Sequence, residues 1–355
     1  MKLNPYLVVG SLAFALAVVG CKKSTDAPQT NGSSGSSSGT AESAAATGDP
    51  DEAAALKLRW AVGGRFGHRM EVTQTMQLPA MPGMPGGGKP TTQEFIMGQD
   101  YSLNVLRERP GGGREVELEF QSANVSVSMN GNEVLGFDTR GEATGDESYP
   151  GVKPLRQMVG KKLTLLLDAS NMVERVEGLT EFRDKVFGDA ASSQDPMAAM
   201  FGEDYFKQIM SQGCDLPAQP VKPGATWPSR FDIIMGPLGK ATLDLTYTFK
   251  GWEQREKRRC AAMTYAGSIS PKAGEQPSGP LAAMMSMTGG QCSGKSWFDP
   301  AIGMIIDNQV DQTIQVRIKL PVPPGPGRNA APPAPPAETT MKQNVSIKLV
   351  EDSRK

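Results

Sequence analysis

Apolar and polar residues alternate along several stretches of the chain, and this period of two predicts β-strands. In the clearest case Val116, Leu118 and Phe120 stand between glutamates. The same period recurs in four further stretches, at residues 125–129, 243–249, 314–320 and 345–349. Asn130-Gly131, directly after the first of these, is typical of a tight hairpin turn. The pattern therefore predicts a mainly β fold built of antiparallel sheets.

One segment has the helical period instead. Leu179, Phe182 and Val186 fall on one face of a helix. Asp195-Pro196 is typical of a helix start, and Gly213 of a helix end. We therefore expect a helical segment at 179–213 whose apolar side packs against a sheet.

Similar short motifs stand in the same order on both sides of this segment. Gly64-Arg65-Phe66 opens one strand and Gly224-Ala225-Thr226-Trp227 opens another, and acidic turns follow at Asp168 and Asp299. Internal duplication would explain the match, but so would chance recurrence of short turn motifs. We predict two similar strand-rich halves, 56–178 and 214–355, which form a curved sheet, a half-barrel or a sandwich and are joined by the helical segment.

Two stretches have neither period. Residues 22–55 are mostly Ser, Gly, Ala, Thr and Asp with almost no large apolar side chain, which predicts a flexible tether from residue 21 to residue 55. Its ends should lie roughly 30 Å apart. The Pro-rich stretch 321–340 predicts an extended, solvated insertion in the second half.

The start of the chain has the pattern of an export signal. Lys2 precedes an apolar run from Leu7 to Val19, and small residues close the run at Val18-Val19-Gly20-Cys21. Residues 1–20 therefore predict a secretory signal peptide, which is too short to span a bilayer.

The tetrapeptide Val18-Val19-Gly20-Cys21 resembles a bacterial lipobox. The resemblance implies that Cys21 receives diacylglycerol, that the chain is cut before it, and that the new amino terminus is acylated. It also implies a cell-envelope location, and Lys22 in place of Asp favours the outer membrane. A plain secretory signal with an incidental cysteine is the alternative. The layout of residues 56–350 resembles exported bacterial lipoproteins that have a domain of unknown function.

Charge and cysteine content exclude several kinds of partner. The formal charge is −1, and the densest basic cluster, Arg255 to Arg259, also contains Glu256, so we predict a solvated hairpin tip and no nucleic-acid binding. Cys214, Cys260 and Cys292 remain for disulfides, whose pairing the spacing does not reveal. His68 is the single histidine, which disfavours a zinc site.

Candidate catalytic and metal motifs lack the context that their chemistry requires. Residues 289–296 match the phosphate-loop pattern letter for letter, but Pro300 and Gly303 argue against the helix that must follow, and we predict a strand there. Met81 and Met84 have the spacing of a Cu(I) site without a histidine partner. We expect no enzyme activity, no cofactor and no metal.

Two functions remain. The first is a non-catalytic envelope lipoprotein, anchored through Cys21, that binds an envelope protein or serves a structural role. The second is a periplasmic carrier or binder of lipid or another apolar ligand, held in a cavity between sheet and helix.

Overall fold

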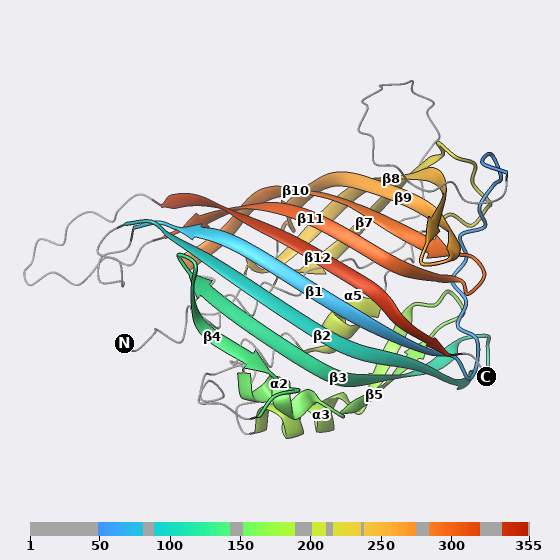
Figure 1. The fold of residues 1–355 in the computed structure, drawn as a ribbon, viewed down its shortest axis with the longest axis horizontal. Helices are drawn as coiled ribbons and strands as arrows, with labels where there is room; N and C mark the ends of the chain where they lie inside the picture. The colour runs from blue at the N-terminus through green and yellow to red at the C-terminus, as the bar shows by residue number, and fades with distance from the viewer. Residues whose placement is uncertain are drawn as a thin grey trace, which may run out of the picture.

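The computed structural model describes residues 49–80, 89–142, 152–188, 201–210, 216–235, 238–274, 284–319 and 336–353. Cys21, the predicted signal peptide and most of the predicted tether lie outside these ranges. The described residues form one large antiparallel sheet with short helices beside it (Figure 1).

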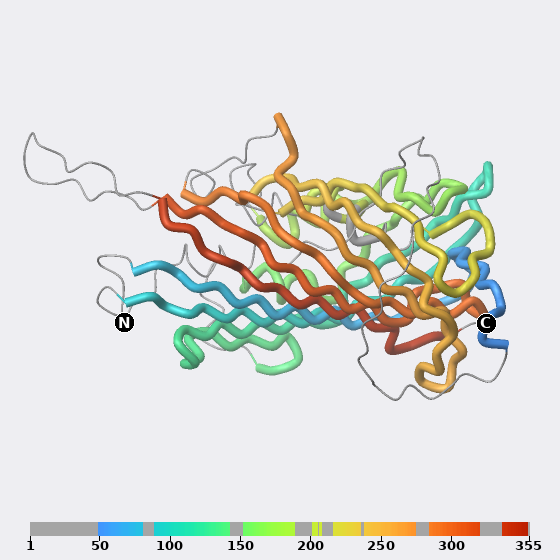
Figure 2. Tube along the Cα trace, turned by 90° about the horizontal axis from the view of Figure 1, so that it is seen from above, coloured from blue at the N-terminus to red at the C-terminus, as the bar shows by residue number. Residues whose placement is uncertain are grey.

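The sheet has twelve strands. In chain order they are β1 Arg65–Leu78, β2 Thr91–Glu108, β3 Arg114–Met129, β4 Asn132–Asp138, β5 Lys162–Leu167, β6 Val173–Glu177, β7 Thr226–Ile234, β8 Lys240–Arg255, β9 Arg258–Pro271, β10 Met285–Asp299, β11 Met304–Ile318 and β12 Ala337–Ser353. Their order across the sheet is β6-β5-β3-β2-β1-β12-β11-β10-β9-β8-β7, and β4 pairs with β3. β1 has 14 residues and β2 has 18, so the long strands extend about 50 Å along the molecule (Figure 2).

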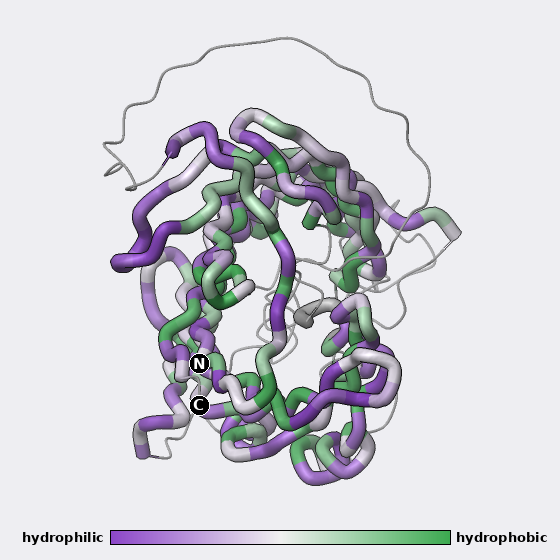
Figure 3. The backbone as a smooth tube through the Cα atoms, turned by 90° about the vertical axis from the view of Figure 1, so that its right-hand side faces the viewer, coloured by the Kyte–Doolittle hydropathy of each residue, from purple (hydrophilic) through white to green (hydrophobic). Residues whose placement is uncertain are grey.

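The alternation in the sequence produces this sheet because successive side chains of a strand point to opposite faces. In β11 the residues Val310, Ile314 and Val316 are buried, whereas Asp311 and Gln315 between them are exposed. The sheet curls so that its buried side faces inward (Figure 3). The prediction of a mainly β, antiparallel fold is confirmed, and among the three predicted forms the curved sheet is the one observed.

Three helices lie in the described residues: α2 Val152–Met158, α3 Leu179–Phe187 and α5 Glu203–Met210. α3 and α5 fall inside the predicted helical segment, whereas α2 was not predicted. α5 contacts both β6 and β7, the two edge strands of the sheet. The helix therefore bridges the edges that the curl brings toward each other.

A cluster of phenylalanines joins these helices to the inner face. Phe120 of β3 lies 5.6 Å from Phe182 of α3, and Phe182 lies 6.2 Å from Phe206 of α5, measured between ring centroids. Phe206 is fully buried. Rings in tilted and edge-on arrangements at these distances contribute beyond the area they bury.

The two halves of the chain are meanders that meet where β1 pairs with β12. Gly64 and Ala225 directly precede the first strand of each half, β1 and β7. If β4, which pairs only with β3, is set aside, the Asp168 and Asp299 turns both follow the fourth strand of their half. Internal duplication would produce this match in position.

Two predicted features, the turn at Asn130-Gly131 and the Pro-rich insertion at 321–340, can be compared with the observed strands. Asn130 and Gly131 have positive φ values of 50° and 80° between β3 and β4, which confirms the predicted hairpin turn. β12 begins at Ala337, inside the range assigned to the Pro-rich insertion, and residues 320–335 lie outside the described residues.

Candidate functional site

A row of buried polar side chains crosses the middle of the inner face. Gln74 of β1 pairs in register with Gln343 of β12, Gln343 with Gln312 of β11, and Gln312 with Cys292 of β10. Each of the four residues is at most 3% exposed. We call these four residues the polar row. Directly opposed residues of neighbouring strands point to the same face, so the row lies on the inner side.

The polar row runs between two apolar rows. Two residues away on one side lie Val72, Val345 and Val310, and on the other lie Met76, Met341 and Ile314, each set aligned across the same three strands. All six are buried. An amide in such surroundings costs free energy unless it is hydrogen-bonded, so the row is not explained by packing alone.

Hydrogen bonding is uneven along the row. Nε2 of Gln312 donates to Sγ of Cys292 over 4.0 Å. At the other end, Oε1 of Gln74 is buried and has no hydrogen-bond partner. Burial raises the pKa of the Cys292 thiol to about 12, so this cysteine is a neutral polar group.

His68 lies on the inner face six residues before Gln74. Its ring stacks on Tyr101 of β2, with 5.3 Å between centroids, and its Nδ1 has no hydrogen-bond partner. Burial lowers the pKa of His68 to about 4, and a hydrogen bond to the Phe66 backbone opposes this shift. The imidazole is therefore uncharged at neutral pH.

Aromatic side chains continue the inner face across β7, β8 and β9. Trp227 stacks on Tyr247 at 5.7 Å between centroids, and Tyr247 lies 4.9 Å from Tyr265. The hydroxyl of Tyr265 donates to Oδ1 of Asn308 over 2.9 Å. Its ring lies over Gly294, where any Cβ would overlap it, so a glycine is needed at that position.

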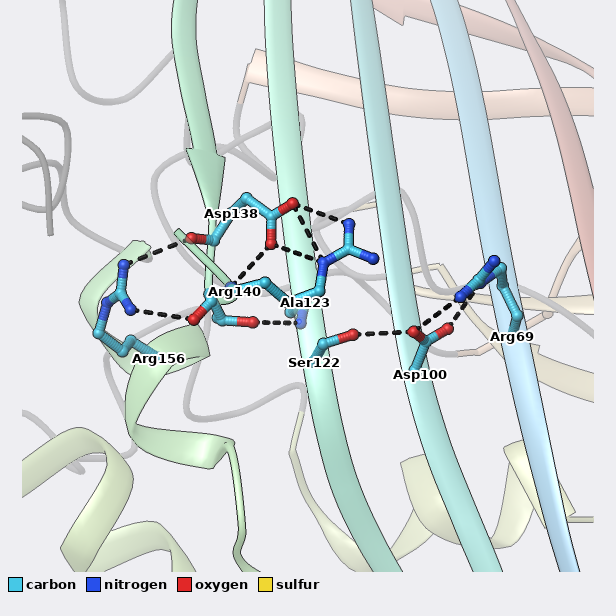
Figure 4. A network of polar contacts seen from close by, with 8 residues as sticks. Arg69, Asp100, Ser122, Ala123, Asp138, Arg140 and Arg156 are labelled. Carbon is cyan, nitrogen blue, oxygen red and sulfur yellow. Dashed lines mark hydrogen bonds and ion pairs between the residues drawn. The ribbon is translucent and has the colours of Figure 1, made fainter. Parts of the chain in front are cut away.

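Charged groups lie on the outer face instead. Arg69 donates to Asp100 through two nitrogens, at 2.8 and 3.1 Å, and Ser122 donates to the same carboxylate at 3.0 Å (Figure 4). The Arg69 hydrogen bond is the main reason why the pKa of Asp100 is lowered. Among the inward positions of β1, β2, β11 and β12 that the structure describes as buried, none carries a charged side chain. His68 is the titratable imidazole among them, and it is neutral at pH 7.

Residues 49–64, which we call the strap, cross one end of the curled sheet (blue in Figure 1; Figure 3). Near β8 the indole nitrogen of Trp252 donates to the carbonyl of Glu52 over 2.8 Å. Near β2 the Val105 amide donates to the carbonyl of Gly64 over 2.9 Å. Since β8 and β2 are far apart in the strand order, the strap joins opposite parts of the sheet.

The basic hairpin tip differs from the prediction. Glu256 and Lys257 form the turn between β8 and β9, as expected. Arg258, however, donates to the buried Asp299 over 2.9 Å, and Arg255 pairs with Asp307 and lies 4.2 Å above the Trp297 ring. The prediction of a solvated tip is wrong for these two arginines because buried carboxylates of β10 and β11 hold them.

The other residues singled out in the sequence have these positions. Residues 289–296 lie within β10, which confirms the strand and contradicts a phosphate loop. Cys260 and Cys292 are buried free thiols, and Cys214, Met81 and Met84 lie outside the described residues. Among the residues with described positions, no group of His, Cys, Asp or Glu could hold a metal ion, and no helix is long and apolar enough to cross a membrane.

The polar row was missed in the sequence, although part of its signal is present there. Gln74 stands in phase with the apolar residues Met70, Val72 and Met76, where alternation predicts an inward side chain. The register of β1, β12 and β11 decides whether Gln343 and Gln312 align with Gln74. β1 is more than 200 residues from the other two strands in the sequence.

Comparison with known proteins gives little direct guidance. No curated protein matches the chain. One solved structure, described as showing lipid–protein interactions in lipovitellin, has 7% sequence identity and a TM-score of 0.43 over 83% of this chain, which spans 26% of that protein. An outer membrane channel from Pseudomonas putida F1 has 8% identity and a TM-score of 0.16, over 83% of this chain and 97% of the channel.

A family model matches residues 112–305, which is more than half of the chain and extends from the end of the β2–β3 turn to the start of β11. The model describes a family of unknown function, DUF6263. The chain belongs to this family.

Proposed function

We propose that this protein is a lipid-anchored, non-catalytic component of the bacterial cell envelope whose curved sheet binds an amphipathic ligand on its inner face. The observation that carries the proposal is the polar row, with buried amides placed between two apolar rows. A core that served stability alone would gain from apolar side chains at these positions. A ligand with both apolar and polar parts complements such a surface.

The chain has side chains that could adapt to a ligand. Met70, Met76, Met97 and Met341 are buried on β1, β2 and β12 around the polar row. Methionine is unbranched and polarisable, so it repacks around ligands of different shape at low cost. α2, α3 and α5 make their main contacts with one another and with β3, β5, β6 and β7, which places the polar row away from the helices.

The anchor is the second part of the proposal. Val18-Val19-Gly20-Cys21 has the residues of a lipobox, and acylation at Cys21 would hold the chain at a membrane. More than one acyl chain makes such binding durable, at about 0.8 kcal/mol per buried methylene. Lys22 favours the outer membrane. The strap begins at residue 49, so the segment that follows the anchor leads directly to one end of the curled sheet.

The case against catalysis rests on the described polar groups. His68, the single histidine, contacts Tyr101 and has no nucleophile bonded to its free Nδ1. The pKa values of the thiols of Cys260 and Cys292 are raised to about 12, which keeps them protonated and unreactive. Neither group has the arrangement that acid–base or nucleophilic catalysis requires.

Ligand binding is tested on the Cys21→Ser chain, which leaves every described residue unchanged. The protein is purified without detergent, and its organic extract is analysed by mass spectrometry against an extract of a protein-free column fraction. We expect an amphipathic compound enriched in a fixed ratio to protein. The binding proposal is wrong if none is enriched and the protein takes up no diacylglycerol from phosphatidylcholine vesicles.

The anchor is tested separately by cell fractionation and by mass measurement of the mature amino terminus. Wild-type protein should pellet with membranes and carry an acylated Cys21, whereas the Cys21→Ser variant should be released. An unmodified Cys21 in wild-type protein would contradict the anchor.

A further inference from the structure

We infer that the ligand is a neutral lipid with a free hydroxyl group, such as a diacylglycerol, and that this hydroxyl donates a hydrogen bond to Gln74. The inference rests on the proposed function and names the ligand class of the same face. It depends on three features: an unpartnered acceptor, the uncharged side chains at the buried inward positions around it, and the apolar rows beside it.

The acceptor is Oε1 of Gln74. The side chain is 3% exposed, and this oxygen has no hydrogen-bond partner. Gln74 ends the polar row, because the next strand places Phe95 beside it. A carbonyl oxygen accepts but does not donate, so a ligand group that satisfies it must bring an O–H or N–H.

The charge of the inner face selects against ionised head groups. The buried inward positions around Gln74 on β1, β2, β11 and β12 carry amides, thioethers and hydrocarbon, and His68, six residues away on β1, is neutral. Arg69, five residues from Gln74, and Arg317, five residues from Gln312, point outward. They pair with Asp100 and Glu338, respectively. A phosphate or carboxylate buried at Gln74 would lose its hydration and gain no cation, which is costly. The ligand's polar group is therefore uncharged.

The apolar part of the ligand has continuous contacts on both sides of Gln74. Val72, Val345 and Val310 lie along one side of the polar row, and Met76, Met341 and Ile314 lie along the other. A hydroxyl attached to long hydrocarbon chains matches the Gln74 acceptor, which lies between two apolar rows. A sugar, with many hydroxyls, would leave most of them unpaired against valine and methionine.

The test compares three lipids with the same acyl chains. Tritiated dioleoylglycerol has a free hydroxyl, dioleoyl-acetylglycerol has that hydroxyl capped, and dioleoyl phosphatidic acid is charged. Each is presented in phosphatidylcholine vesicles to the full Cys21→Ser chain, and uptake is measured after the vesicles are removed. The same measurement is made with Gln74→Leu and with Gln77→Leu, whose side chain is exposed on the outward face of the same strand.

We expect dioleoylglycerol to bind best, with the other two lipids weaker by about tenfold, the size of one hydrogen bond to a buried acceptor. Gln74→Leu should lower dioleoylglycerol binding by about the same factor and leave binding of the capped lipid unchanged. Gln77→Leu should change neither. Gln74→Leu should also unfold at no lower urea concentration than the parent chain, because it removes an unpaired buried amide, so weaker binding would not reflect misfolding.

The possible failures are distinguishable. Uptake of none of the three lipids would overturn this inference, and it would overturn the proposed function as well if no compound is enriched in the organic extract of the purified protein. Equal uptake of the free and capped lipids, or an unchanged affinity in Gln74→Leu, would overturn the inference and leave amphipath binding in place. Preference for phosphatidic acid would show that the polar group is charged and would also overturn it.

Discussion

Replacing His68, the single histidine of the chain, with phenylalanine should make the protein more resistant to mild acid. The imidazole is 7% exposed, stacks on Tyr101 and has an unpartnered Nδ1. Burial lowers its pKa from 6.5 to about 4. Phenylalanine preserves a flat ring against Tyr101 and takes up no proton.

The lowered pKa sets both the sign and the size of the effect. Between pH 6.5 and about 4 the unfolded chain binds a proton at His68 that the folded chain does not bind. Stability is therefore complete above pH 6.5 and is lost as the pH falls toward 4. Each pH unit in this range costs about 1.4 kcal/mol, so the wild-type protein should lose roughly 3 kcal/mol from this residue.

Urea unfolding at pH 7 and at pH 4 measures this loss. Carboxylates also titrate near pH 4, but they are the same in both proteins and cancel in the difference. The Tyr101→Phe variant, which retains the stacked pair, should behave as wild type. If wild type and His68→Phe lose equal stability between the two pH values, His68 is not held neutral in the folded protein. The claim that burial lowers its pKa on the inner face would then be wrong.

Three further predictions concern packing and outer-face charge, each measured by urea unfolding at pH 7. Gly294→Ala should cost about 2 kcal/mol because the new methyl group overlaps the ring of Tyr265. Phe206→Ala should cost about 4 kcal/mol because a fully buried ring that joins α5 to the inner face is lost. Arg69→Gln should cost about 0.5 kcal/mol, since Arg69 is half exposed, and this cost should vanish as the pH falls through the lowered pKa of Asp100.

Neighbouring residues provide the controls for these substitutions. Exposed Ser293→Ala, and Lys207→Ala, which removes one partly exposed ion pair with Glu203, should each change stability by less than about 0.5 kcal/mol. A tolerated Gly294→Ala would mean that both the Tyr265 ring and the Gln309 backbone move aside, and a neutral Phe206→Ala would mean that α5 does not hold the sheet edges. A cost in Arg69→Gln that persists at low pH would show that the ion pair is not its cause.

Much of the fold could be predicted because alternation is local. The period of two at Val116, Leu118 and Phe120 requires only that one face of a strand is buried, and the structure has that strand as β3. The order of strands in the sheet could not be predicted in this way. The pairing of β1 with β12 joins residues such as Val72 and Val345, which are far apart in the sequence, and no local pattern shows it. α2 was missed because it has only seven residues and buries three of them, too few for a clear helical period.

The candidate site could be predicted only in part for the same reason. Gln74 stands in phase with Val72 and Met76, so the sequence contains the signal for an inward amide, and the structure has that side chain buried. Whether that amide meets another amide or a valine is decided by register, and register is not visible in either strand alone. The lipid anchor shows the opposite case, since a short contiguous motif predicts it and no feature of the folded part is needed.

Register also gives the polar row a role in folding that is separate from ligand binding. Gln74 faces Gln343 in the observed pairing, and a slip of β12 by two residues would place Met341 or Val345 there instead. Such a slip preserves the inward direction of every apolar side chain, so hydrophobic burial alone does not select against it. It would, however, move the amide of Gln343 away from that of Gln74 and place Gln74 opposite Met341 or Val345, so that a polar side chain faces hydrocarbon across the β1–β12 pair. The row therefore favours one alignment of β1, β12 and β11. This matters most at the β1–β12 pair, where the two halves meet and no short hairpin turn fixes the register.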